Sequence, residues 1–264
     1  MMASPEEVAN SFGWPTGLAE IAMKSKNSIA FRFLLVDNSL SMSTKKGHRL
    51  VDLESAPSYE ICTRWEAVSA SVKNIAKLAD LVEVPTEIRL LNNSSPIIVG
   101  QSNSQENLAT ILSQLDAGPA GQSSIDKDLT DIIQQIKGME QSLITDNKVA
   151  LLIIISDSKS SDNSIVDTMS ALEGLPVKVV IQISSCDKDQ IEYWSNLNSQ
   201  LKTDLHILLD FEGEAKFIHP QNSWLNYGLP LHQAREFGIM VPEVDKLGYH
   251  KLSEQEIKIM GQIL

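Results

Sequence analysis

Three side chains that could bind a metal ion follow the first strongly apolar segment of the chain, in the stretch FRFLLVDNSLSM. Asp37, Ser39 and Ser41 stand at alternate positions directly after that segment. Alternate residues of an extended chain face the same way, so their oxygen atoms can converge on one point. A carboxylate and two hydroxyls are hard oxygen ligands of the kind that Mg²⁺ prefers. The stretch predicts a metal site, and turn formation by Asp and Ser is the plainer alternative.

Two more oxygen-bearing side chains stand at comparable places in the chain. Asp157 ends a second apolar strand, KVALLIIISD, and Ser123 lies in the loop GPAGQSSIDKDL just before a helical pattern. Ligands of open α/β sheets bind outside the carboxyl ends of the strands, where both strands deliver their aspartates. Two facing carboxylates repel each other, and a divalent cation between them removes that repulsion.

The elements that must position these residues alternate regularly along the chain. Apolar segments predict strands at 28–36, 84–91, 96–100, 148–157, 176–183 and 204–211. Helical periodicity predicts helices at 63–80, 104–115, 123–139, 164–172 and 188–201. Such alternation is typical of a doubly wound α/β fold, with a mostly parallel central sheet and helices on both faces. Pro96 favours an edge position for the short 96–100 strand, which we expect to be antiparallel.

The domain organisation predicted from this pattern has three parts. Residues 1–24 form an N-terminal arm, 25–211 the α/β domain, and 212–264 a C-terminal extension that packs on the domain. The stretch 43–61 reads as a long loop beside the proposed metal ion, and loops of this length are commonly functional. We expect it to form one wall of a partner-binding surface.

The motifs in these loops resemble those of von Willebrand factor A-like (vWA) domains. VDNSLSM is similar to their DxSxS motif, PAGQSSIDKDL to their second loop, and IIISDS to the strand that ends in their third-loop aspartate. The resemblance covers about residues 28–211. Leu40 stands where the family usually has Gly, Ser123 where it has Thr, and Ser158 where Gly often follows the last aspartate.

This resemblance implies a metal-ion-dependent adhesion site that binds Mg²⁺ or Mn²⁺. Ser39, Ser41 and Ser123 would be direct hydroxyl ligands, and Asp37 and Asp157 direct or water-mediated ones. An Asp or Glu of a protein partner would complete the coordination, as is common in these domains. We expect the partner to contact a rim formed by His48, Ser158 and Lys159.

Composition narrows the kinds of partner and compartment. Lys and Arg number 22 against 34 Asp and Glu, which gives a net charge of −12 and argues against nucleic acid or an anionic membrane as a partner. The two cysteines stand far apart and in no metal-binding spacing. The N-terminus lacks the pattern of a secretory signal, so we expect a cytoplasmic protein.

Two alternatives to a metal-dependent binding module remain open. SDSKSSD resembles the strand-end aspartates of haloacid-dehalogenase-like phosphotransferases, in which Asp37 would be the nucleophile. That family needs a second aspartate two residues later as its acid, and Ser39 stands there. The other alternative is a structural scaffold with a vestigial metal site. The prediction is a binding protein that is not an enzyme.

Overall fold

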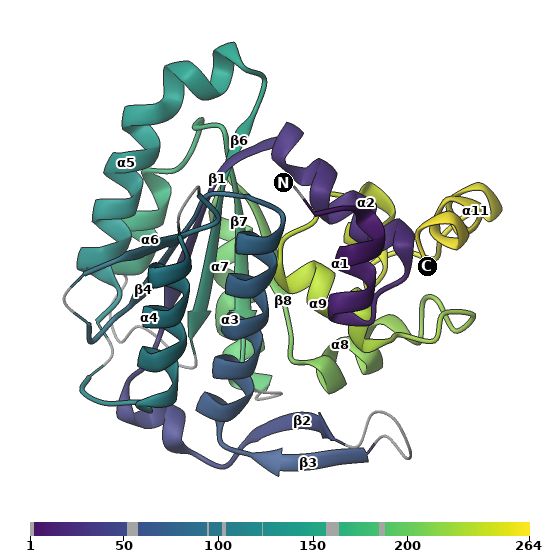
Figure 1. Cartoon of the computed structure of the whole chain (residues 1–264), viewed down its shortest axis with the longest axis horizontal. Coiled ribbons are helices and arrows are strands. Elements are labelled where there is room, and N and C mark those ends of the chain that lie inside the picture. Colours follow the sequence, from purple (N-terminus) through teal and green to yellow (C-terminus); the bar gives the residue numbers. More distant parts are fainter. Residues whose placement is uncertain are drawn as a thin grey trace.

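A computed structural model describes residues 3–51, 58–93, 95–101, 104–122, 124–156, 164–184 and 188–264. Figure 1 shows a central sheet with helices on both faces and a group of short helices from the two ends of the chain beside it. The predicted α/β fold class is confirmed.

The central sheet has six strands in the order β5-β4-β1-β6-β7-β8. Their bounds are Ile29–Val36 for β1, Thr86–Leu90 for β4, Ile97–Val99 for β5, Val149–Ser156 for β6, Val177–Ile183 for β7 and Asp204–Leu208 for β8. Only β5 runs antiparallel, against β4 at the edge of the sheet, as Pro96 had indicated. The strand order reverses between β1 and β6, so this fold has its topological switch point there.

The two faces of the sheet bury separate apolar clusters, because successive side chains of each strand point to opposite sides. In β1, Leu34 and Val36 belong to one cluster, whereas Phe33 and Leu35 belong to the other. The second cluster is covered by α5 (Asp126–Thr145), α6 (Ser164–Ser170) and α7 (Lys188–Gln200). The first is covered by α3 (Arg64–Leu81) and α4 (Gln105–Asp116) together with the terminal segments.

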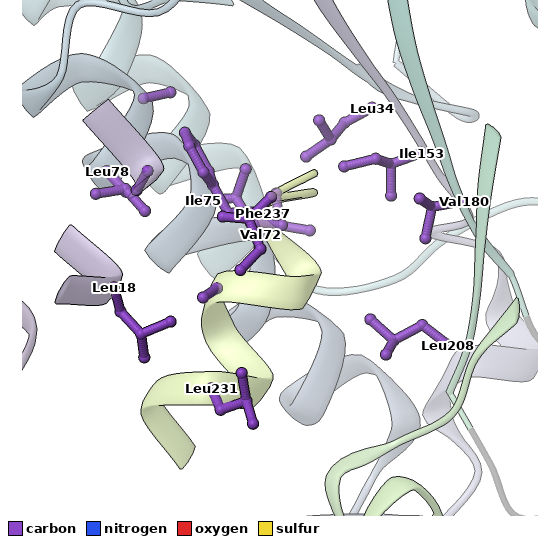
Figure 2. Close-up of a cluster of buried hydrophobic side chains, with 14 of the residues drawn as sticks. Leu18, Leu34, Val72, Ile75, Leu78, Ile153, Val180, Leu208, Leu231 and Phe237 are labelled. Carbon is purple, nitrogen blue, oxygen red and sulfur yellow. The ribbon is translucent and has the colours of Figure 1, made fainter. Parts of the chain in front are cut away.

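Both terminal segments contribute side chains to the core on that first face. In Figure 2, Phe237 of the C-terminal segment lies beside Val72 and Ile75 of α3. Leu231 of α9 and Leu18 of the N-terminal segment belong to the same apolar cluster as the sheet residues Leu34 and Ile153. The helices of these segments are α1 (Pro5–Phe12), α2 (Thr16–Lys24), the 3₁₀ helix η1 (Ser25–Asn27), α8 (Phe211–Ile218), α9 (Leu229–Glu236), α10 (Pro242–Lys246) and α11 (Glu254–Ile263). The division of the chain into an arm at 1–24, a domain at 25–211 and an extension at 212–264 stays a prediction.

The prediction of a long loop at 43–61 was wrong in part. A 3₁₀ helix η2 (Leu40–Ser43) is followed by an antiparallel hairpin of β2 (Gly47–Val51) and β3 (Ser58–Cys62). This hairpin lies beside the lower end of the sheet in Figure 1. Most of β3 is exposed, so its sequence lacks the apolar alternation that would have revealed a strand. Residues 52–57 lie outside the described part of the chain.

Three helices begin with a capping pattern that is visible in the sequence. Ser4 with Glu7, Thr63 with Glu66, and Ser253 with Glu256 each form a reciprocal capping box, which satisfies backbone N–H groups at the first turn. Element boundaries elsewhere agree to within a few residues; the helix expected at 123–139 begins at Asp126 and continues to Thr145.

Candidate metal site

Asp37 follows β1 directly and is held by three hydrogen bonds. Its backbone N–H donates to the carbonyl of Ile155 in β6 at 2.8 Å. Its carboxylate accepts from the backbone N–H of Ser39 at Oδ1 and from the hydroxyl of Ser156 at Oδ2, each at 2.9 Å. The side chain is only 1 % exposed. The carboxylate is therefore fixed in position at the switch point of the sheet.

The hydroxyls of Ser39 and Ser41 are hydrogen-bonded to each other, with their oxygen atoms 2.9 Å apart. Around an ion with six oxygen ligands at about 2.1 Å, neighbouring ligands of an octahedron lie about 3.0 Å apart. The two hydroxyls thus have the spacing that adjacent ligands of Mg²⁺ need. They reach it through the tight turn of η2, and not through the extended run expected from the sequence.

Leu40, which stands where vWA-like domains usually have Gly, fits its position without strain. Among the described residues, Glu83 and Asn147 are the non-glycine residues with a positive φ, so Leu40 does not need the freedom of glycine. Its N–H donates to the carbonyl of Gly121 at 3.2 Å, and its side chain is 64 % exposed. The substitution places an apolar side chain at the surface, between the two serines.

The loop at 117–122 is joined to the first loop by backbone hydrogen bonds. The N–H of Ala120 donates to the carbonyl of Asn38 at 2.7 Å, next to the bond between Leu40 and Gly121. Gly121 has φ +77°, and a Cβ added to it would lie 2.2 Å from Oδ1 of Asn92. A glycine is therefore required where these loops approach each other.

Three hydrogen-bonded asparagines, of which Asn38 is buried, complete this frame, and the sequence analysis missed them. Asn38 accepts at Oδ1 from the backbone N–H of Asn92 at 2.9 Å and donates from Nδ2 to Oδ1 of Asn93 at 3.1 Å. Asn92 and Asn93 directly follow β4, in the sequence RLLNNSS. The sequence signal that could have revealed Asn92 and Asn93 is a pair of polar residues after a predicted strand. Ser156, just before Asp157, is likewise a polar residue at the end of a strand.

The structure brings Asp37, Ser39 and Ser41 together, whereas Ser123, Asp157, Ser158 and Lys159 lie outside the described residues. His48 lies on β2, with Nδ1 at 3.7 Å from both Oδ2 of Asp210 and Oε2 of Glu212. It faces the start of α8, and its role at a partner-binding rim stays a prediction.

The described donors suit a hard cation. Among the described residues, no group of three or more His, Cys, Asp or Glu side chains could hold a metal ion. The described candidate ligands are therefore the carboxylate of Asp37 and the hydroxyls of Ser39 and Ser41. Oxygen ligands of this kind select Mg²⁺ or Mn²⁺ over softer metals. Cys62 is buried, and burial raises the pKa of its thiol, which leaves it in the unreactive protonated form.

No protein-family model matches the chain, and no curated protein matches its sequence. The chain is similar in fold to solved structures that include vWA domains. The VWA domain of SpRpn10 has 14 % identity and a TM-score of 0.44, over 67 % of this chain and 86 % of that one. The conserved hypothetical protein BatB from Bacteroides thetaiotaomicron has 10 % identity and a TM-score of 0.47, over 88 % of this chain and 98 % of that one.

Manganese-loaded TRAP protein from Plasmodium vivax is a third similar structure. It has 14 % identity and a TM-score of 0.38, over 64 % of this chain and 62 % of that one. At these identities the likeness concerns the fold alone. None of the helices in the described part of the chain is both long and apolar enough to cross a bilayer.

Proposed function

We propose that this chain is a metal-dependent protein-binding module of the vWA type. Asp37, Ser39 and Ser41, with Ser123 and Asp157, would hold Mg²⁺ or Mn²⁺ at the carboxyl ends of β1 and β6. The observation that carries the proposal is the spacing of the Ser39 and Ser41 hydroxyls beside a fixed, buried carboxylate. A bound cation would supply an exposed positive charge that attracts a carboxylate from a partner.

The chain's own residues prepare this site for an acidic partner. Ser41 and Leu40 are exposed, whereas Asp37 and Ser39 are buried beneath them, so a partner would meet the cation from the side of η2. An Asp or Glu side chain from the partner would supply a further oxygen ligand. Without the cation, the net charge of −12 would oppose an acidic partner.

A nucleophilic role for Asp37 is disfavoured by its surroundings. A phosphotransferase nucleophile must reach its substrate, but Asp37 is buried and each of its oxygens already accepts a hydrogen bond. Ser39, two residues after Asp37, has no carboxyl group that could act as the general acid. We therefore propose binding without catalysis. Hydrolysis of an aryl phosphate that is lost in Asp37→Asn would contradict this.

The test is calorimetric titration with MgCl₂ and MnCl₂, alone and with an Asp-containing peptide present. We expect saturable binding by the wild-type protein and none by the Asp37→Ala/Ser39→Ala variant. The matched control is Asp146→Ala/Ser142→Ala. Both residues are exposed and lie at the end of α5, just before the amino end of β6. Equal cation binding by both variants, or none by the wild-type protein with peptide, would overturn the proposal.

A further inference from the structure

A cavity of about 280 Å³ lies at the carboxyl ends of β7 and β8, apart from the candidate metal ligands. Its wall combines the β2–β3 hairpin, α3, the end of β7, the start of α8 and α9. The carboxyl ends of parallel strands are where open α/β sheets bind their ligands. Strand β2 of the hairpin that was expected as a loop thus forms one side of this half-open cavity.

Glu236 of α9 is the central polar group of this cavity. Its Oε1 accepts from Nε2 of Gln182 at 2.7 Å, and the same nitrogen lies 3.4 Å from the hydroxyl of Ser71. Among the described residues, no hydrogen-bond donor reaches its other oxygen, Oε2. The side chain is 7 % exposed and lines the cavity. Its carboxylate therefore retains one acceptor oxygen for a ligand.

Buried hydrogen bonds order the side chains that lie beside Glu236. Arg235 pairs with the carboxylate of Glu214 and donates to the hydroxyl oxygen of Tyr227 at 3.3 Å. Burial keeps the pKa of Tyr227 well above its ordinary value, so its hydroxyl stays protonated and can donate to Nδ1 of His232, 3.0 Å away. Nε2 of His232 lies 3.5 Å from Oε1 of Glu236, close to it but without a hydrogen bond.

Two other buried oxygens at the cavity need a donor. Oε1 of Gln182 and the hydroxyl of Ser184 have no hydrogen-bond partner among the described residues, and both side chains are 5 % exposed. A buried polar group left in this state costs about 1–3 kcal/mol. Both residues line the cavity, although these two atoms are themselves buried.

Charge and apolar surface narrow the class of ligand further. Arg49 also lines the cavity, but its guanidinium binds Glu60 through Nε and Nη2, at 3.0 and 2.8 Å. Of the two carboxylates that line the cavity through Asp210 and Glu236, that of Asp210 lies 3.7 Å from Nδ1 of His48, and that of Glu236 keeps one oxygen that accepts no hydrogen bond from the described residues. Apolar side chains form the rest of the wall, among them Leu50, Val68, Ile183, Phe211 and Leu229.

We propose that this cavity binds a small organic primary amine. The ammonium group binds Glu236 through a charge-assisted hydrogen bond, and the hydrocarbon part packs against Val68, Ile183 and Leu229. This site is separate from the proposed metal site and does not depend on it.

The experiment uses benzylamine as the probe, with benzoate as an anion of similar shape and size. Methyl-labelled full-length protein is titrated with each compound and followed by NMR. We expect benzylamine to shift the methyl signals of Val68, Ile183 and Leu229, while Ile111 of α4 stays unchanged. Equal shifts from benzoate, or no local shift from benzylamine, would overturn the proposal.

Two variants locate the binding. Glu236→Gln keeps the shape of the side chain and removes its charge, so we expect the affinity for benzylamine to fall about tenfold or more. Glu254→Gln, on the exposed face of α11, is the matched control and should bind as the wild type. Ala67→Phe fills the cavity from α3 and should abolish the shifts without disturbing the Glu236 network. Unchanged binding in Ala67→Phe would place the amine elsewhere and contradict the proposal.

Discussion

Arg32 of β1 lies against the ring of Phe237, with its guanidinium carbon 4.3 Å from the ring centroid. The arginine is fully buried, and it also donates from Nη2 to the hydroxyl of Ser25 at 2.7 Å and from Nε to the carbonyl of Phe237 at 3.3 Å. One side chain of the central sheet therefore joins the end of the N-terminal segment to the C-terminal segment. The terminal segments are bound into the core and do not merely rest on it.

Phe237→Ala should strongly destabilise the protein. The substitution removes a fully buried ring and leaves the guanidinium of Arg32 without the face that covers it. We expect a loss of about 3–5 kcal/mol in the free energy of unfolding, measured by urea denaturation. Phe237→Leu is the control, because it retains apolar volume and should lose less than about 1.5 kcal/mol. Equal losses in the two variants would show that the aromatic ring is not what matters.

Gly121→Ala should be more harmful than Gly118→Ala, although both glycines have positive φ. An added Cβ at Gly118 has no atom within 4 Å, whereas at Gly121 it would lie 2.2 Å from Oδ1 of Asn92. Gly118→Ala should lose about 1 kcal/mol through backbone strain. Gly121→Ala should lose about 1–3 kcal/mol more, because Asn92 must move away from Asn38. Thermal and urea unfolding compare the pair, and similar losses would contradict the close approach of these loops.

Much of the fold could be predicted because local signals and burial agree. The strand β6 is apolar on both faces and β1 is so apart from Arg32, as is typical of parallel strands buried between two helical layers. The hairpin of β2 and β3 escaped prediction because it is exposed and its polar residues show no period of two. The place of Phe237 in the core depends on contact with a strand some 200 residues earlier, which no local pattern records.

The sequence indicated candidate ligands of the site, but not the residues that hold its loops together. Asp37, Ser39 and Ser41 lie within five residues of one another, so the sequence could indicate that they are neighbours. Asn38 and Asn92 were missed because their role is to hydrogen-bond one loop to another. In the sequence, such an asparagine looks the same as one that only forms a turn. The convergence of the Ser39 and Ser41 hydroxyls depends on the η2 turn, which the sequence did not indicate.

Ser156→Ala should separate positioning of Asp37 from ligation of the metal. The hydroxyl of Ser156 is a buried donor to Oδ2 of Asp37, so its removal should lower the free energy of unfolding by about 1–3 kcal/mol. Cation binding should persist, because the ligand oxygens remain. Ser170→Ala, on the exposed face of α6, should change stability by less than about 0.5 kcal/mol. Abolished Mn²⁺ binding in Ser156→Ala, measured by calorimetry, would make Ser156 itself part of the ligand set.

The C-terminal helix α11 should lose its first turn in acid at an unusually low pH. Hydrogen bonds from Lys246 and from the backbone N–H of Ser253, at 2.8 Å each, lower the pKa of Glu256 to about 2. Since the folded-state pKa lies below the ordinary value of 4.5, the stabilising contribution is complete above pH 4.5 and disappears as the pH falls toward 2. Titration of the Glu256 carboxyl by ¹³C NMR, together with amide exchange in residues 254–263, measures both effects.

Lys246→Met tests the cause of that shift. Without the ammonium group, the pKa of Glu256 should rise toward its ordinary value, while the capping hydrogen bonds from Ser253 hold it partly down. Fraying of α11 should then begin at a higher pH than in the wild type. Lys258→Met, on the same helix, is the control and should leave the titration of Glu256 unchanged. If Lys246→Met titrates as the wild type does, the capping box alone sets the pKa of Glu256, and the contact between α10 and α11 does not contribute.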